Sequence, residues 1–267
     1  MKSTPRRIGA LVVGLTISPG VADTETAPAT NAETVERSDR EPSPEVRAKV
    51  DRELAEWAAA NPDEVTASAI VTVPVYVHVF YDRDNRVGYL SADQIWDQLR
   101  WLNHSYSGGQ GGSTTRFRFQ LRSYERIGLA DHTVHFTAAG NPTDRTARLM
   151  RNNHNGGKGT LNIWTGDTAG AVGVARFPWE QAAHPNIDGV WVKANAWRHT
   201  PSGPRCTVQG DTAVHEVGHW LGLHHTDTSP VCGGQRNFMS YGNDGAMRAF
   251  TSNQATRMSN MWGRYRS

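Results

Sequence analysis

The clearest pattern of apolar and polar residues predicts a helix over Pro44–Ala60. Four apolar residues recur there at spacings of four, four and three, which places them on one helical face: Val46, Val50, Leu54 and Trp57. Asn61-Pro62 follows and favours the end of the helix. A single amphipathic helix needs a surface to cover, so we expect it to pack on the following domain or to serve as a pro-segment.

Further patterns predict a sheet and additional helices. Val71–Tyr81 alternates as a strand does, and Ser91 begins a predicted helix with Gln94 as its capping-box partner. The other strand-like runs are Arg116–Leu121, Leu161–Thr165, Ala171–Ala175 and Gly189–Ala194. A long helix is predicted at Thr212–Leu223. Because the strands cluster before this helix, the expected fold class is α+β.

The N-terminus has the pattern of an export signal over residues 1–22. Basic residues precede the apolar stretch Ile8–Ile17, and Gly20 and Ala22 are small residues of the kind found at a cleavage site. The alternative is a frayed terminus. The apolar stretch is too short for a permanent membrane anchor, and no second stretch reaches membrane length. We therefore expect a secreted protein without a membrane anchor.

Charge divides the remaining chain. Residues 23–64 carry twelve acidic and five basic residues, whereas the whole chain has a net charge of +2. This small charge gives no indication of a nucleic-acid partner. We interpret residues 23–67 as an acidic pro-segment or linker with one amphipathic helix, and residues 68–267 as the main domain. An acidic leader can dock on a basic body, although a disordered tail is equally allowed.

Two cysteines, Cys206 and Cys232, are the only ones in the chain. An even pair in an exported protein predicts one disulfide, with free thiols as the alternative. A zinc site built on cysteines would need closely spaced pairs, which this chain lacks.

The segment HEVGHWLGLHH carries the chemistry. Residues four apart share a helical face, so His215 and His219 can hold one metal ion. The carboxylate of Glu216 can then reach a metal-bound water as general base. Gly222 allows the left-handed turn that ends the helix.

The reversed chain brings a third histidine to the metal. The register of the motif selects His225 over the neighbouring His224. Three protein ligands and one water are typical of a catalytic zinc ion, and the predicted reaction is hydrolysis of peptide bonds.

Met239 follows His225 by fourteen residues and resembles the Met-turn of the metzincins. That resemblance implies that Met239 packs beneath the imidazoles and that Tyr241 supports the oxyanion. Several stretches resemble the pappalysin family of metzincins: TAVHEVGHWLGLHH, NFMSYGNDGAM, AFTSNQATRM, FPWEQAAHPNIDGVWV and the N-terminal VPVYVHVFYDRDNRVGYLSADQIWDQLRWLNHSYSG. This implies an extracellular endopeptidase with a twisted mixed sheet, a zinc helix and an irregular C-terminal subdomain.

The chain departs from the family at two places. Members commonly hold latency with a pro-segment cysteine, but no cysteine precedes Cys206, so latency would require another group such as a carboxylate of the acidic leader. The segment between His225 and Met239 keeps only Asp227 where the family often places calcium-binding acids, which argues against a Ca²⁺ site.

The expected substrates are proteins or peptides. The run Ala169–Ala175 is a candidate edge strand for an extended substrate, or else an ordinary buried strand. Asp244 is a candidate for favouring Arg or Lys after the cleaved bond, or else a solvated loop carboxylate. The alternative function is an inactive, zinc-stabilised module that binds peptides, and the presence of Glu216 argues against it.

Overall fold

A five-stranded sheet with the strand order β2-β1-β4-β7-β6 organises the fold. This computed structural model describes residues 41–66, 69–137, 140–169, 172–197, 210–226, 236–240 and 247–267. The strands are β1 (Val71–Asp82), β2 (Phe117–Leu129), β4 (Leu161–Gly166), β6 (Gly173–Ala175) and β7 (Val190–Lys193). The pairs β1/β2, β1/β4 and β4/β7 are parallel, whereas β6 runs antiparallel to β7 at the edge. The predicted mixed sheet is therefore confirmed.

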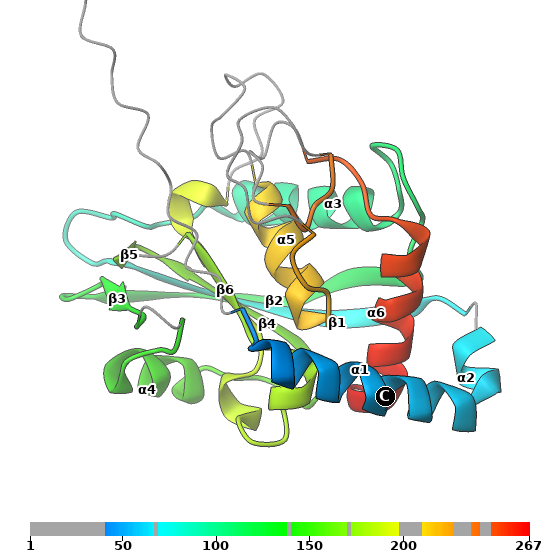
Figure 1. The fold of residues 1–267 in the computed structure, drawn as a ribbon. Coiled ribbons are helices and arrows are strands. Elements are labelled where there is room, and N and C mark those ends of the chain that lie inside the picture. Colours follow the sequence, from blue (N-terminus) through cyan, green and yellow to red (C-terminus); the bar gives the residue numbers. More distant parts are fainter. Residues whose placement is uncertain are drawn as a thin grey trace, which may run out of the picture. The chain divides into compact units, whose positions relative to one another are not determined.

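Helices cover both faces of this sheet (Figure 1). They are α1 (Pro44–Ala60), α2 (Pro62–Thr66), α3 (Ala92–Tyr106), α4 (Asp144–Asn152), α5 (Asp211–Trp220) and α6 (Ser252–Tyr265). Short 3-10 turns lie at η1 (Pro178–Glu180), η2 (Pro185–Ile187) and η3 (Ala194–Ala196), and β3 (Val134–His135) pairs with β5 (Thr168–Ala169). Within the part of the chain that the structure describes, no helix has the length and apolar character needed to cross a membrane.

The main core lies between the sheet and the helices α3 and α5. Alternate residues of β1 are fully buried because successive side chains of a strand point to opposite faces: Val73, Val75, Val77 and Val79. They share one apolar cluster with Leu99 of α3 and Val217 of α5. On the opposite face, Trp164 and Trp191 pack with Met150 of α4.

Helix α3 fixes the start of α5. Gln98 donates a hydrogen bond from Nε2 to the carbonyl of Gly210 at 2.9 Å, and Trp101 donates from Nε1 to Asp211 Oδ1 at 2.7 Å. The hydroxyl of Tyr106 donates to the carbonyl of Val214 at 3.1 Å. Since all three donors lie on one helix, α3 sets the position of the turns that carry the histidine motif.

The observed bounds confirm several predicted elements and correct others. Helix α1 has the predicted bounds, and the capping box of α3 forms, because Ser91 Oγ accepts from the backbone of Gln94 and Gln94 Oε1 accepts from the backbone of Ser91. Helix α5 ends at Trp220, before the predicted Leu223. Strand β2 continues to Leu129, and the helices α4 and α6 were not predicted.

Candidate metal centre

Helix α5 presents His215 and His219 on one side, one turn apart. Both side chains are buried, at 0% and 3% exposure, because the helix lies within the main core. The helix ends at Trp220, and two residues later Gly222 adopts φ +92°. A residue with a side chain resists this left-handed conformation. The turn reverses the chain and returns His225 to the two helical histidines.

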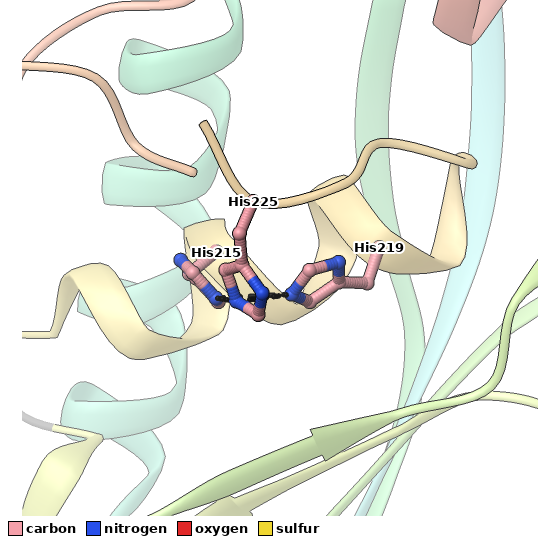
Figure 2. Close-up of side chains that lie close together, drawn as sticks. All are labelled: His215, His219 and His225. Atoms are coloured by element: carbon pink, nitrogen blue, oxygen red, sulfur yellow. Dashed lines mark hydrogen bonds between the residues drawn. The ribbon is translucent and has the colours of Figure 1, made fainter. Parts of the chain in front are cut away.

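The three imidazoles converge on one point (Figure 2). Their Nε2 atoms are separated by 3.0 Å (His215 to His219), 3.0 Å (His215 to His225) and 3.1 Å (His219 to His225). The centre of such a triangle lies about 1.8 Å from each nitrogen. This is slightly shorter than the usual zinc–nitrogen distance of about 2.0–2.1 Å, so one ion can contact all three nitrogens.

The outer ring nitrogens show why this triangle suits a cation. Nδ1 of His215 lies 2.6 Å from the carbonyl of Phe238, and Nδ1 of His219 lies 2.8 Å from the carbonyl of Leu223. A carbonyl only accepts, so both Nδ1 atoms carry the hydrogen and, in the neutral rings, both Nε2 atoms present lone pairs. Two lone pairs that face each other at 3.0 Å repel, and a bound cation removes this repulsion.

His224 lies outside the triangle, although it is adjacent to His225 in sequence. Its Nε2 accepts a hydrogen bond from Arg257 of α6 at 2.9 Å, and its ring lies near Phe177 and Trp179. Burial and then the nearby Arg257 lower the pKa of His224 to about 4, so its ring is neutral at pH 7. The structure thus brings together the three histidines selected by the motif's register and leaves His224 with a different partner.

The turn Asn237–Ser240 supports two of the three histidines. Its Phe238 carbonyl accepts from His215, and its Met239 carbonyl accepts from the backbone of Thr226, the residue after His225, at 3.0 Å. The side chain of Asn237 fixes the turn, because its Oδ1 accepts from the Met239 backbone at 2.9 Å. Met239 is fully buried, and a Cβ placed on Gly218 of α5 would lie only 2.4 Å from its sulfur.

The side chain of Glu216 extends from α5 to the edge strand β6. Its side chain is 1% exposed. A Cβ placed on Gly173 of β6 would come within 2.3 Å of Oε1 of Glu216, so the carboxylate lies directly against the backbone of the edge strand. Of the predicted run Ala169–Ala175, residues Gly173–Ala175 form the edge strand β6, which contacts Glu216 at Gly173 and is also buried.

Several predicted site residues lie outside the described residues. They are Tyr241, Asp244, Cys206 and Cys232, together with residues 1–22 of the predicted signal peptide and residues 23–40 of the acidic leader.

Three contacts of the centre were missed by the sequence analysis. Glu41 Oε2 lies 2.7 Å from Nδ1 of His225, Arg257 binds His224, and Gln254 pairs with Asn237 through both polar atoms of its side chain. The last had a sequence signal, because Thr251 and Gln254 have the spacing of a capping box, which marks the start of α6. The sequence analysis named a carboxylate of the acidic leader only as a latency group, not as a partner of His225.

Comparison with known proteins places the chain in a family. No family model matches it. Extracellular metalloprotease 1 of Coccidioides posadasii is 30% identical over 236 residues, which are 74% of this chain and 79% of that protein. An extracellular metalloprotease of Verticillium alfalfae is 29% identical over 254 residues, 76% of this chain and 80% of that protein.

Solved structures show the same fold. Mature mirolysin of Tannerella forsythia in complex with a cleaved peptide has a TM-score of 0.56 at 23% identity and covers 72% of this chain and 91% of its own. Promirolysin of Tannerella forsythia has a TM-score of 0.58 at 20% identity, and the match covers 83% of this chain and 92% of that chain. The fold brings three imidazoles together, and the chain is 30% identical to an extracellular metalloprotease. The chain therefore belongs to the extracellular metalloproteases and is an enzyme, a metalloprotease of the hydrolase class.

Proposed function

We propose that the protein is a secreted zinc endopeptidase of the pappalysin family of metzincins, with His215, His219 and His225 as the metal ligands and Glu216 as the general base. One observation carries the proposal: three Nε2 atoms lie within 3.1 Å of one another on a buried helix and its returning turn. The extracellular metalloproteases among its relatives support secretion and protein substrates.

The donor set fits zinc. Neutral imidazoles are common zinc ligands, and three protein ligands leave a fourth position open. Bound zinc would lower the pKa of a water molecule towards neutrality and polarise the scissile carbonyl.

Glu216 is the proposed base. It follows His215 directly on the same helix, and this motif spacing supports a place for its carboxylate near the reacting water rather than among the metal ligands. In the proposed reaction Glu216 accepts the proton of the attacking water and then delivers it to the departing amine. Burial strengthens this role because a water-poor site increases the effect of each charge on the reacting atoms.

The edge strand β6 is the proposed binding place for an extended substrate. A peptide can add to the edge of a sheet through main-chain hydrogen bonds, and β6 is the terminal strand of the sheet. The backbone of Gly173 lies against Glu216, so a peptide aligned along this strand would pass close to the base.

Other assignments of the proposal rest on the sequence. Tyr241 would donate a hydrogen bond to the developing oxyanion, and Asp244 would favour Arg or Lys after the cleaved bond. Cys206 and Cys232 would form a disulfide. Residues 1–22 would be removed on export, and residues 23–67 would form the leader of a catalytic domain that spans 68–267.

The test is cleavage of casein or a peptide library by the purified protein. We expect activity to be lost after removal of metal with a chelator and restored by one equivalent of Zn²⁺. Glu216→Gln should bind zinc normally and lower kcat by more than about 10³-fold, because general acid–base catalysis contributes up to about 10⁴-fold. Glu125→Gln, on the opposite edge strand β2, is the control and should keep activity.

Two results would contradict the proposal. Cleavage that persists in Glu216→Gln would remove Glu216 from the mechanism. Zinc-dependent peptide binding without any cleavage by the wild-type protein would favour the alternative function, an inactive peptide-binding module.

A further inference from the structure

The outer nitrogens of the three histidines have partners of two kinds. Those of His215 and His219 donate to backbone carbonyls. The outer nitrogen of His225 instead lies 2.7 Å from a carboxylate oxygen of Glu41, a residue 184 positions earlier in the chain. The outer nitrogen of His225 thus faces a charged group, and that group belongs to the acidic leader.

Glu41 is fixed from its own side as well. Its second oxygen, Oε1, forms an ion pair with Arg47 of α1, and Arg47 also donates from Nε to the carbonyl of Pro42 at 3.0 Å. The carboxylate therefore bridges Arg47 and His225. Since Ser43 caps the N-terminus of α1, the position of Glu41 follows from the position of this helix.

Helix α1 packs firmly on α6. Val50 and Leu54 of α1 are buried against Met261 of α6, and Trp57 lies so close to Gly263 that a Cβ there would meet its ring at 2.5 Å. This apolar contact provides most of the attachment of α1 to α6, because the ion pairs between the two helices are partly exposed and such pairs contribute little to stability.

Ion pairs set the register of the same two helices. Asp51 lies 2.7 Å from Arg257, and Glu53 lies 3.0 Å from Arg264. Arg257 also donates from Nε to the carbonyl of Gly222 at 2.7 Å. Arg257 therefore links α1 to the turn that returns His225 to the metal centre.

We propose that Glu41 is a positioning residue for His225 and that the segment Glu41–Ala60 is a permanent part of the metal centre. This inference rests on the proposed function. A carboxylate on the outer nitrogen fixes the ring orientation, keeps the hydrogen on Nδ1 and makes Nε2 a better donor to a metal. Glu41 contacts the nitrogen that lies outside the triangle, so it leaves the open side of the metal to water and substrate.

Zinc affinity of the full chain tests this inference by competition with a chromophoric chelator. We expect Glu41→Ala to raise the Kd for zinc about 10–100-fold, the usual effect of losing the outer partner of a ligand, and Glu41→Gln to raise it less because the amide oxygen still accepts. Glu45→Ala is the matched control, since Glu45 is an exposed acid of the same leader, and its Kd should equal that of the wild type. The thermal midpoint of the metal-free protein should be similar in all variants.

The outcomes separate this inference from the proposed function. A wild-type protein that binds no zinc would overturn the proposed function itself. A wild-type protein that binds zinc, with an unchanged Kd in Glu41→Ala, would overturn only the role of Glu41. N-terminal sequencing of the active, zinc-loaded enzyme gives a second test: we expect residues 41–60 to be present, and an active enzyme that begins after Ala60 would overturn the permanence of the segment.

Discussion

At the scale of single residues, two glycines determine how closely other groups approach α5. Gly218 lies between His215 and His219, and a side chain there would displace the sulfur of Met239. Gly173 of β6 faces Glu216 in the same manner. Real Cβ atoms do not approach other atoms as closely as 2.3–2.4 Å, so a side chain at either position would displace the neighbouring Glu216 or Met239.

With Glu216 as the proposed base, Gly173→Ala is expected to lower kcat/KM by about 10–100-fold, because displacement of a catalytic group by about 1 Å costs up to about 10²-fold. Stability should change little, since the clash falls on the flexible end of Glu216. Gly157→Ala is the control, because a Cβ there meets nothing within 4 Å. Steady-state kinetics on a peptide substrate measures the effect. Wild-type kcat/KM in Gly173→Ala would show that the carboxylate does not act from the observed position.

At the scale of elements, the start of α6 and the turn Asn237–Ser240 form one unit. The side chain of Gln254 completes the capping box with Thr251 and exchanges two hydrogen bonds of 2.9 Å with Asn237. Because that turn provides the carbonyls that hold His215 and Thr226, the cap of a helix also supports the metal centre.

Gln254→Ala should therefore lower both stability and zinc affinity. Loss of capping and of the bonds to Asn237 is expected to reduce the free energy of unfolding by about 1–3 kcal/mol, and the Kd for zinc should rise. Gln94→Ala removes the equivalent capping-box residue of α3, which has no bond to the turn, and should reduce stability by about 1 kcal/mol without changing the Kd. Urea unfolding and zinc competition measure the two effects. Equal zinc affinity in both variants would contradict the coupling.

The predictable elements are those whose pattern is local. The apolar stripe and stop signal of α1, the alternation of β1 and the capping box of α3 each lie within one segment. The second half of β2 is partly exposed at the edge of the sheet, so it has no clean alternation and was missed.

Within the site, the spacing of the motif placed His215 and His219 because it repeats the helical period. The contact between Glu41 and His225 joins residues 184 positions apart, and no local pattern could reveal it.

At the scale of the whole molecule, Arg266 joins three distant parts of the chain. Its guanidinium forms two bonds to Asp188, at 2.7 and 3.1 Å, and donates to the carbonyls of Lys158 and Trp220. Both charged residues are buried, at 2% and 1% exposure. The group thus holds the end of α5 against the loops that flank the sheet.

Arg266→Met is expected to lower the free energy of unfolding by about 3–5 kcal/mol, because it leaves the buried charge of Asp188 without its partner. Arg264→Met removes an arginine two residues away whose ion pair with Glu53 is partly exposed, and should cost about 0–1 kcal/mol. Urea unfolding of both variants measures the difference. Similar losses in the two proteins would contradict the structural importance of the buried pair.

Because a bound cation removes the repulsion between the Nε2 lone pairs of the histidine triangle, the stability of the fold depends on the metal ions around the molecule. An ion that binds only the folded triangle stabilises the fold by mass action, and each tenfold rise in its free concentration above Kd adds about 1.4 kcal/mol to the free energy of unfolding. Conditions poor in free metal would weaken the fold as well as stop catalysis. The lifetime of the enzyme, including its resistance to other proteases, would then follow the metal content of its medium.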